Sequence, residues 1–203
     1  EIIDQRTLNA VEQWKPLGFD QVGAVIIMQS DEGDAACAAG AKIAESHGAI
    51  DASYSSDPRD SADLIQLRKL AYPALERLGA ALLDDVCVPI TAIARLVTAV
   101  QAIADRHQLL IGIFGHGGDG NMHPTIVYEH GNAAAESLAR TAFQEIIDVA
   151  QQLGGTASGE HGIGNIKVTS ALNESDKTVV KLQREIKSIF DPNGILNPGK
   201  KLP

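Results

Sequence analysis

The sequence predicts an α+β fold in which helices cover one side of an antiparallel sheet, with split strand–helix–strand units doubled within the chain. Three observations lead to this prediction. Some apolar runs have the length of strands, and longer segments carry apolar residues at helical spacing. These segments follow one another as strand–helix–strand and then helix–strand–strand–helix. With 203 residues, 44% of them hydrophobic, the chain can bury the core of one large domain, residues 1–203, or of two small lobes.

The first predicted elements are a strand and a helix. Residues 22–29, VGAVIIMQ, form a continuous apolar run rich in β-branched residues. Residues 31–49 then predict a helix, because acidic residues stand at its start, alanines fill it and Gly48 supplies a stop. The polar opening, EIIDQRTLNA, does not have the pattern of a signal peptide.

A second helix and strand follow. Residues 60–79 predict a helix that starts from an Asp or Ser cap and is broken or kinked near Pro73. Residues 80–89, AALLDDVCVP, predict one strand that Pro89 closes.

The centre of the chain predicts one helix and two strands. Residues 90–107 carry apolar side chains at helical spacing, namely Ile93, Leu96, Val97, Val100 and Ile103. Residues 108–116 and 121–130 are strand-like. Residues 132–155 then predict a long helix that ends in two glycines, and residues 174–190 a last helix with Asn173 or Ser175 as its cap.

Composition excludes several classes of protein. A formal net charge of −9 and a pI of about 5.0 argue against a nucleic-acid partner. No apolar run reaches the ~20 residues that a membrane-spanning helix needs. Cys37 and Cys87 stand in apolar runs, where we expect free thiols in a reducing compartment. These features favour a cytoplasmic protein, with peripheral association to a membrane left open.

The segment GHGGDG, residues 115–120, has the spacing G-x-G-x-x-G after an apolar run. In a dinucleotide-binding fold these glycines open a helix, whose N-terminus meets the pyrophosphate. Here NMHPTIVY follows, with Pro124 and β-branched residues, so a helix cannot begin there. The dinucleotide hypothesis is therefore rejected.

Asp119-Gly120 between two strand-like runs predicts a two-residue hairpin loop instead. In that register His116 pairs with His123, so the two imidazoles face each other on one side of the sheet. Opposed Cβ atoms lie about 4.5–5.5 Å apart, close enough for both rings to share a metal ion. The alternative is a hairpin with two incidental histidines.

A second segment, GGTASGEHGIG at residues 154–164, carries an adjacent acid and base. Adjacent side chains on an extended loop point apart, so Glu160 and His161 would serve different roles. Glu160 could complete a His₂Glu set suited to Zn²⁺ or Mn²⁺, with His161 free beside the ion to accept a proton. A helix end followed by a glycine-rich turn with a solvated Glu-His pair explains the same residues.

Four motifs in order, DDVCVP, GHGGDGNMHP, SGEHGIG and FDPNGILNPGK, resemble the C-terminal domain of FAD-linked oxidases. More narrowly they resemble the branch of D-lactate dehydrogenase and the glycolate oxidase flavin subunit. The similarity runs from about Arg68 to the C-terminus. It implies a ferredoxin-like α+β fold for the substrate-binding, or cap, half of the enzyme, and an FAD-binding domain that precedes this half and is absent from the chain.

The resemblance implies a role for each site residue. His116, His123 and Glu160 match the metal ligands, and His161 matches the catalytic base. Arg68 matches the arginine that binds the substrate carboxylate, as a planar bidentate donor can; by itself it would be read as a solvated helix residue. Asn197 matches a terminal segment that approaches the flavin in relatives. The alternative is a turn-forming Asn before Pro.

The implied reaction is oxidation of a D-2-hydroxy acid to the 2-oxo acid with FAD and Zn²⁺ or Mn²⁺. A quinone, a cytochrome or an electron-transfer flavoprotein would reoxidise the flavin, and a homodimer is compatible with the resemblance. D-2-hydroxyglutarate dehydrogenases resemble one another in extra polar residues that are lacking at Tyr72, Leu83 and Thr125, which favours D-lactate or glycolate. The alternatives are another 2-hydroxy acid, such as D-2-hydroxyglutarate, and a metal-binding or interface module without catalysis.

Overall fold

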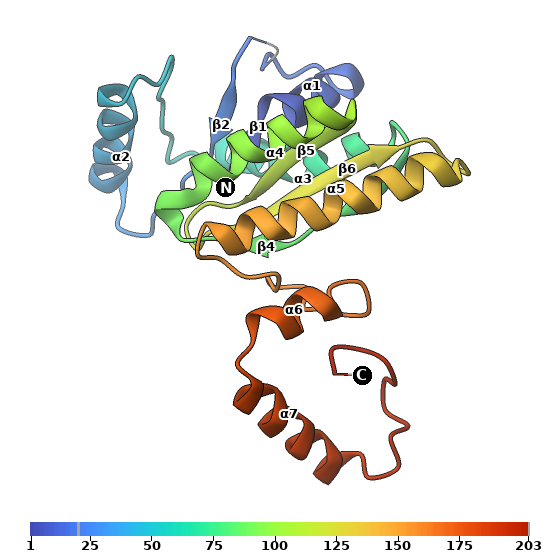
Figure 1. Ribbon diagram of the computed structural model, residues 1–203. Coiled ribbons are helices and arrows are strands. Elements are labelled where there is room, and N and C mark those ends of the chain that lie inside the picture. Colours follow the sequence, from blue (N-terminus) through green and yellow to red (C-terminus); the bar gives the residue numbers. More distant parts are fainter. Residues whose placement is uncertain (20, 203) are drawn as a thin grey trace.

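The computed structural model describes residues 1–19 and 21–202, with the side chain of Asp63 left aside. Its described strands form one six-stranded antiparallel sheet in the order β2-β1-β5-β6-β3, with β4 also paired to β6 (Figure 1). The strands are β1 (Ile2–Asp4), β2 (Ala24–Ile26), β3 (Ala80–Leu83), β4 (Val86–Cys87), β5 (Leu110–His116) and β6 (Asn121–Tyr128). The predicted α+β class with an antiparallel sheet is confirmed.

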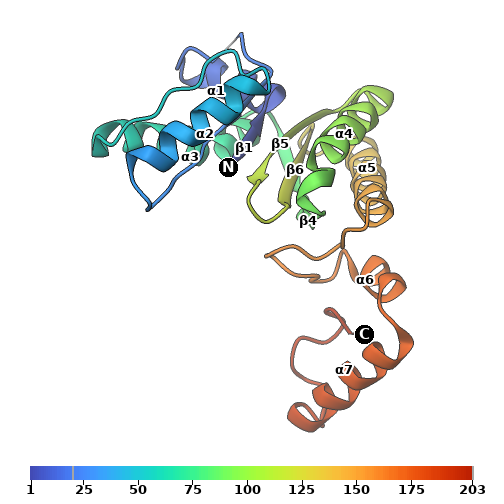
Figure 2. The same cartoon turned by 90° about the vertical axis from the view of Figure 1, so that its left-hand side faces the viewer.

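Helices cover both faces of this sheet, so the expectation of helices on one side only is wrong. The pair α4 (Ile93–His107) and α5 (Ala133–Gln152) packs on one face, and α1 (Gln5–Trp14) and α3 (Pro58–Glu76) pack on the other (Figure 2). The reason lies in the strands, which bury apolar side chains on both faces: Ile113 joins the α4–α5 core and its neighbour Phe114 joins the α1–α3 core. The doubling of a split unit stays a prediction.

The central hairpin pairs in a register two residues away from the predicted one. His116 lies opposite Asn121, and Phe114 lies opposite His123. The predicted pairing of His116 with His123 is therefore wrong. Because the shift is an even number of residues, both histidines keep the same face of the sheet.

The hairpin loop explains this difference, since it has four residues, 117–120, and not two. The N–H groups of Asp119 and Gly120 both donate to the carbonyl oxygen of His116, at 3.2 and 3.1 Å. Gly120 has φ +81°, and a Cβ there would stand 2.0 Å from the carbonyl oxygen of Val88. Only glycine fits this close approach.

The predicted strand 80–89 is interrupted at Asp84-Asp85 but keeps one register. Ala80 pairs with Tyr128, and Val86 pairs with Met122, which places β3 and β4 on a single continuous ladder along β6. The carboxylates of Asp84 and Asp85 at this interruption are both buried.

Other boundaries differ modestly from the prediction. The opening residues form β1 and α1, which the polar pattern did not predict, with Asp4 as the N-cap of α1. Helix α3 continues through Pro73. Helix α2 (Asp34–Ser46) has no buried residues and lies apart from the sheet (Figure 1). Cys37 and Cys87 are free and half-buried, and burial raises the pKa of the Cys87 thiol.

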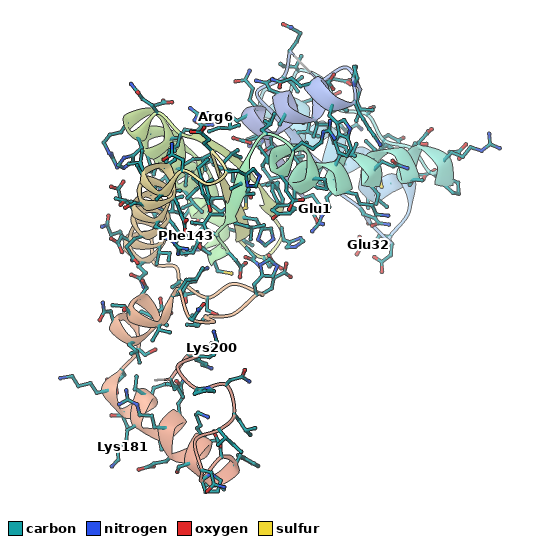
Figure 3. All side chains as sticks on the ribbon, turned by 90° about the vertical axis from the view of Figure 1, so that its right-hand side faces the viewer. Glu1, Arg6, Glu32, Phe143, Lys181 and Lys200 are labelled. Carbon is teal, nitrogen blue, oxygen red and sulfur yellow. The ribbon has the colours of Figure 1, made fainter. Side chains whose placement is uncertain are left out.

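A C-terminal arm leads away from the sheet. It comprises residues 168–202 and includes α6 (Val168–Glu174), which was not predicted, and α7 (Lys177–Phe190), capped by Asp176 and not by Asn173 or Ser175. Figure 3 shows Lys181 and Lys200 on this arm, well away from Glu1. None of the residues of α7 is buried. No helix in the described residues has the length and apolar character to span a membrane.

Candidate functional site

The sheet register gathers polar side chains on the face that α3 covers. Continuing the β1–β5 ladder by one residue puts Glu1 opposite His116, and continuing the β4–β6 ladder puts Asp85 opposite His123. The two histidines are diagonal neighbours across the hairpin, with ring centroids 5.3 Å apart and planes edge-on at 88°. The diagonal arrangement brings the imidazoles together although they are not directly opposed.

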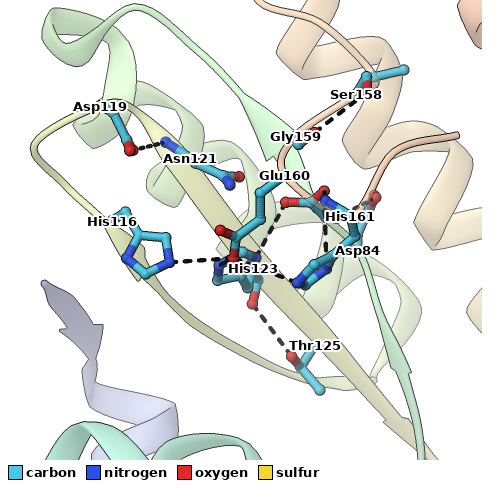
Figure 4. Close-up of polar contacts among 12 residues, drawn as sticks. Asp84, His116, Asp119, Asn121, His123, Thr125, Ser158, Gly159, Glu160 and His161 are labelled. Carbon is cyan, nitrogen blue, oxygen red and sulfur yellow. Dashed lines mark hydrogen bonds and ion pairs between the residues drawn. The ribbon is translucent and has the colours of Figure 1, made fainter.

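The loop after α5 brings Glu160 and His161 over these histidines. Thr156 and Cys87 exchange two backbone hydrogen bonds, and the N–H of Gly159 donates to the carbonyl oxygen of Asp85 at 3.2 Å. A Cβ on Gly159 would lie 2.1 Å from Asp85 Oδ1, so the loop approaches the sheet this closely only with glycine there. Figure 4 shows the result, with Glu160 reaching toward both histidines.

The three predicted metal ligands converge. Glu160 Oε1 lies 3.3 Å from His116 Nε2 and 3.5 Å from His123 Nε2, and one ligand atom from each of the three residues lies within 4.8 Å of the other two (Figure 4). In a tetrahedral site with metal–ligand bonds of about 2.0–2.1 Å, ligand atoms stand about 3.4 Å apart. The donor set therefore fits a divalent metal ion.

The exposure of these ligands matches an open coordination site. The side chain of His123 is 3% exposed, that of His116 is 26% and that of Glu160 is 51%. The site is closed on the sheet side and open toward the loop. Three protein ligands with one open side are the arrangement of catalytic rather than structural metal sites.

His161 stands next to the ligands on the open side. Its ring stacks on His123 with centroids 5.2 Å apart and planes 16° from parallel, and its Nε2 lies 3.4 Å from Glu160 Oε1. The side chain is 52% exposed, so a proton acquired there can reach solvent. Ligand atoms of Asp85, His123 and His161 also lie within 4.8 Å of one another, so these residues form a second possible metal-binding set.

Asp85 belongs to the site although it was not among the predicted site residues. Its Oδ2 accepts the main-chain N–H of His161 at 2.8 Å, and its Oδ1 lies 3.4 Å from His123 Nδ1. Burial acts to raise its pKa, but the hydrogen bonds with His123 and His161 and the charges of His161 and Lys167 outweigh burial and lower the pKa to about 2. An ionised carboxylate therefore lies beside the His123 ring at neutral pH.

Lys167 ties the strand interruption to the loop, and it too was not predicted. Its ammonium lies 2.7 Å from Asp84 Oδ1 and donates to the carbonyl oxygens of Asp85 and Ala157. Both charged side chains are buried, Lys167 at 4% exposure and Asp84 at 0%. Burial raises the pKa of Asp84, and the neighbouring ammonium opposes that rise. Two features of the sequence point to this ion pair: the acidic pair inside the predicted strand 80–89, and a lysine three residues after the GIG segment.

Arg68 reaches the site from α3. Its Nη2 lies 3.5 Å from His116 Nε2, and its Nε lies 3.4 Å from Glu1 Oε1. The guanidinium thus stands beside the predicted metal ligands. The side chain is 38% exposed, so it remains accessible.

Asn197 is the one predicted site residue that the structure does not bring to the others. It lies on the C-terminal arm with φ +47°, and its carbonyl oxygen accepts from the N–H of Lys200. Within residues 1–19 and 21–202, the hydrogen bonds and ion pairs of Asn197 include none to the histidines. Its proposed role remains a prediction.

The comparisons with known proteins show the family of the chain. The family described as FAD linked oxidases, C-terminal domain, matches residues 1–201, including the first sixty residues that the motif resemblance did not cover. The chain is 32% identical to the glycolate oxidase subunit GlcD of Bacillus subtilis (strain 168) over 98% of its length and 44% of that protein. It is 37% identical to a D-lactate dehydrogenase of Archaeoglobus fulgidus over 79% of its length and 35% of that protein.

A solved structure extends the likeness of the fold. The 4-ethylphenol oxidase from Gulosibacter chungangensis, in an isoeugenol complex, matches 98% of this chain and 46% of its own, with a TM-score of 0.60 and 16% sequence identity. The chain spans less than half the length of each of these proteins.

Proposed function

The chain belongs to the family of FAD-linked oxidase C-terminal domains, and from this membership we propose that it is the substrate- and metal-binding half of an FAD-dependent dehydrogenase. The substrate is a small D-2-hydroxy acid such as D-lactate or glycolate, and the product is the 2-oxo acid. The similarity to a glycolate oxidase subunit and to D-lactate dehydrogenases supports this substrate class. An FAD-binding domain outside the 203 residues would hold the flavin.

One observation carries the proposal. Two imidazoles and a carboxylate from three separate places in the sequence meet with a spacing that suits a metal ion, and a guanidinium stands beside them. Incidental histidines or a solvated Glu-His pair would not require this convergence, nor the glycine that permits it at position 159.

Each side chain then has a task. His116, His123 and Glu160 would hold Zn²⁺ or Mn²⁺, and the bound ion supplies Lewis acidity that lowers the pKa of the substrate hydroxyl. Arg68 binds the substrate carboxylate through two N–H groups and orients the α-carbon. His161 accepts the hydroxyl proton at Nε2 and returns it to solvent across its exposed edge.

The remaining roles lie outside the sheet. Bound FAD supplies the acceptor for the hydride that leaves the α-carbon. Asn197 would approach the flavin from the C-terminal arm. A quinone, a cytochrome or an electron-transfer flavoprotein reoxidises the flavin, and one relative is named a D-lactate dehydrogenase [cytochrome]. We place the enzyme in the cytoplasm or at a membrane surface, as a monomer or homodimer.

A small monocarboxylate suits this site better than a diacid. Among the positions that would contact a second carboxylate, Thr125 is fully buried and its hydroxyl donates to the carbonyl oxygen of His123. Leu83 is apolar, and the hydroxyl of Tyr72 is directed to Glu76 at 3.5 Å. None of these three side chains carries a positive charge.

The proposal is tested by metal content and flavin reduction. His116→Ala and His123→Ala should each remove the metal and abolish turnover of the enzyme assembled with its FAD-binding half. His161→Ala should keep the metal, measured by elemental analysis, and lose reduction of FAD by substrate. Normal metal content in either of the first two variants, or full FAD reduction in the third, would count against the assignment.

A further inference from the structure

Glu1 has a fixed place in the sheet although it precedes the first strand. Its carbonyl oxygen accepts the N–H of Ile27 at 3.0 Å, which extends the β1–β2 ladder by one residue. On the other side it continues the register of β1 with β5, where Ile2 lies opposite Gly115. The side chain of Glu1 therefore projects on the same face as that of His116.

One carboxylate oxygen of Glu1 contacts two site residues. Glu1 Oε1 lies 2.9 Å from His116 Nδ1 and 3.4 Å from Arg68 Nε. Its Oε2 is buried and has no hydrogen-bond partner among the described residues. Within the part of the chain that the structure describes, no other donor competes with these two for the carboxylate.

This contact decides which nitrogen of His116 is available. A carboxylate at 2.9 Å from Nδ1 favours the tautomer with the proton on Nδ1, since an ionised carboxylate only accepts hydrogen bonds. Nε2 is then a bare acceptor for Arg68 Nη2 at 3.5 Å, while Glu160 Oε1, at 3.3 Å from Nε2, competes for the ring proton from a longer distance than Glu1 does at 2.9 Å. A bare Nε2 is the form of imidazole that binds a metal ion.

The same carboxylate orients the guanidinium. With Nε of Arg68 directed to Glu1, the guanidinium edge that carries Nη2 faces His116 and the open side of the site. A single side chain thus connects the proposed metal ligand with the proposed substrate-binding residue.

We propose that Glu1 is a positioning residue that holds His116 in its Nδ1–H tautomer and fixes the orientation of Arg68. The proposal rests on the proposed function, because it assigns Nε2 of His116 to the metal and Arg68 to the substrate. It adds a carboxylate that contacts neither the metal nor the substrate and that acts through His116 and Arg68.

The first test reads the tautomer in the metal-free chain and needs no enzyme activity. Long-range ¹H–¹⁵N correlation spectra of the neutral imidazole should show His116 protonated on Nδ1. Glu1→Gln keeps a carbonyl acceptor and should retain this tautomer, whereas Glu1→Ala should shift it toward Nε2–H. An Nε2–H tautomer of His116 in the unaltered chain overturns the proposal, whatever the variants do.

The second test measures affinity for Co²⁺, followed by its visible absorption. Glu1→Ala should weaken Co²⁺ binding about tenfold, the effect expected when the partner of a ligating imidazole is lost, and Glu1→Gln should weaken it less. Glu136→Ala, which removes a surface carboxylate paired with Arg140 on α5, is the matched control and should bind as the unaltered chain does. Equal affinity in Glu1→Ala and the control would contradict the proposal.

The two tests separate this inference from the proposed function. If the unaltered chain fails to bind Co²⁺ while His116 is protonated on Nδ1, the metal site is wrong and the hydrogen bond to Glu1 stands. If the chain binds Co²⁺ and the tautomer is Nε2–H, the metal site stands and the role of Glu1 is wrong.

Discussion

Removing the ammonium of Lys167 should cost more stability than any single surface change in this chain. In Lys167→Met the apolar stem is replaced at similar volume, and Asp84 Oδ1 and the carbonyl oxygens of Asp85 and Ala157 lose their donor. Breaking a buried ion pair by removing one partner costs about 3–5 kcal/mol, because the remaining charge stays buried. We expect about 3 kcal/mol, since Asp84 can take up a proton and limit the cost.

The loss of stability in Lys167→Met should depend on pH. Burial already holds the folded-state pKa of Asp84 above its ordinary value of 3.8, and loss of Lys167 raises it further. The folded variant therefore binds a proton more strongly than the unfolded chain, so its stability is greatest at low pH and falls as the pH rises. The destabilisation should be larger at about pH 8 than at about pH 5.

Urea unfolding followed by circular dichroism measures these differences, with the free energy of unfolding extrapolated to water. Lys167→Met/Asp84→Asn is the informative control. Because the double variant removes both charges of the Asp84–Lys167 pair, it should be more stable than the single variant Lys167→Met, with a coupling energy of about 2 kcal/mol. Additive costs for the two substitutions, or a single-variant cost below about 1 kcal/mol, would refute the reasoning.

Three further predictions concern the loop over the site. Gly159→Ala should abolish Co²⁺ binding, because its Cβ would stand 2.1 Å from Asp85 Oδ1, whereas Gly118→Ala, with open space around it, should bind normally; equal affinities would show that the close approach is not required. Asp85→Asn should weaken Co²⁺ binding about tenfold through the loss of the charge behind His123, and unchanged affinity would remove Asp85 from the site. The pKa of Glu174 is lowered because hydrogen bonds from Thr156, Ala157 and Gln151 outweigh burial, so its contribution is present above its ordinary pKa of 4.5 and is lost as the pH falls through the folded value. Glu174→Gln should then cost about 1–2 kcal/mol at pH 7, a figure reduced for the exposure of this side chain, and less as the pH falls below the ordinary pKa of 4.5; a cost that does not change with pH would contradict this account.

Local patterns predicted the elements well where the chain interacts with its near neighbours. The helices at 90–107 and 132–155 and the strands around the hairpin were found because apolar spacing reports directly on burial. The short strand β1 was not, because its three residues carry too little periodicity to be distinguished from a polar helix start. The shape of the hairpin loop was missed because the three glycines among residues 117–120 permit several turns.

The candidate site was predicted only in part, for a related reason. The sequence predicts His116, His123 and Glu160 as metal ligands because they lie in the motifs GHGGDGNMHP and SGEHGIG. Asp85 and Glu1 join the site through pairings with residues 38 and 115 positions further along the chain, and no local pattern encodes such a register. Long-range strand pairing, and not local propensity, selects these two carboxylates.

The separation of α7 from the sheet has a consequence for any measurement of folding. A helix of 14 residues without buried side chains is marginal by itself in water. Its amide protons should therefore exchange with solvent faster than those of β5 and β6 by orders of magnitude. A single melting transition would report on the unfolding of the sheet and its two helical layers and would not report on α7.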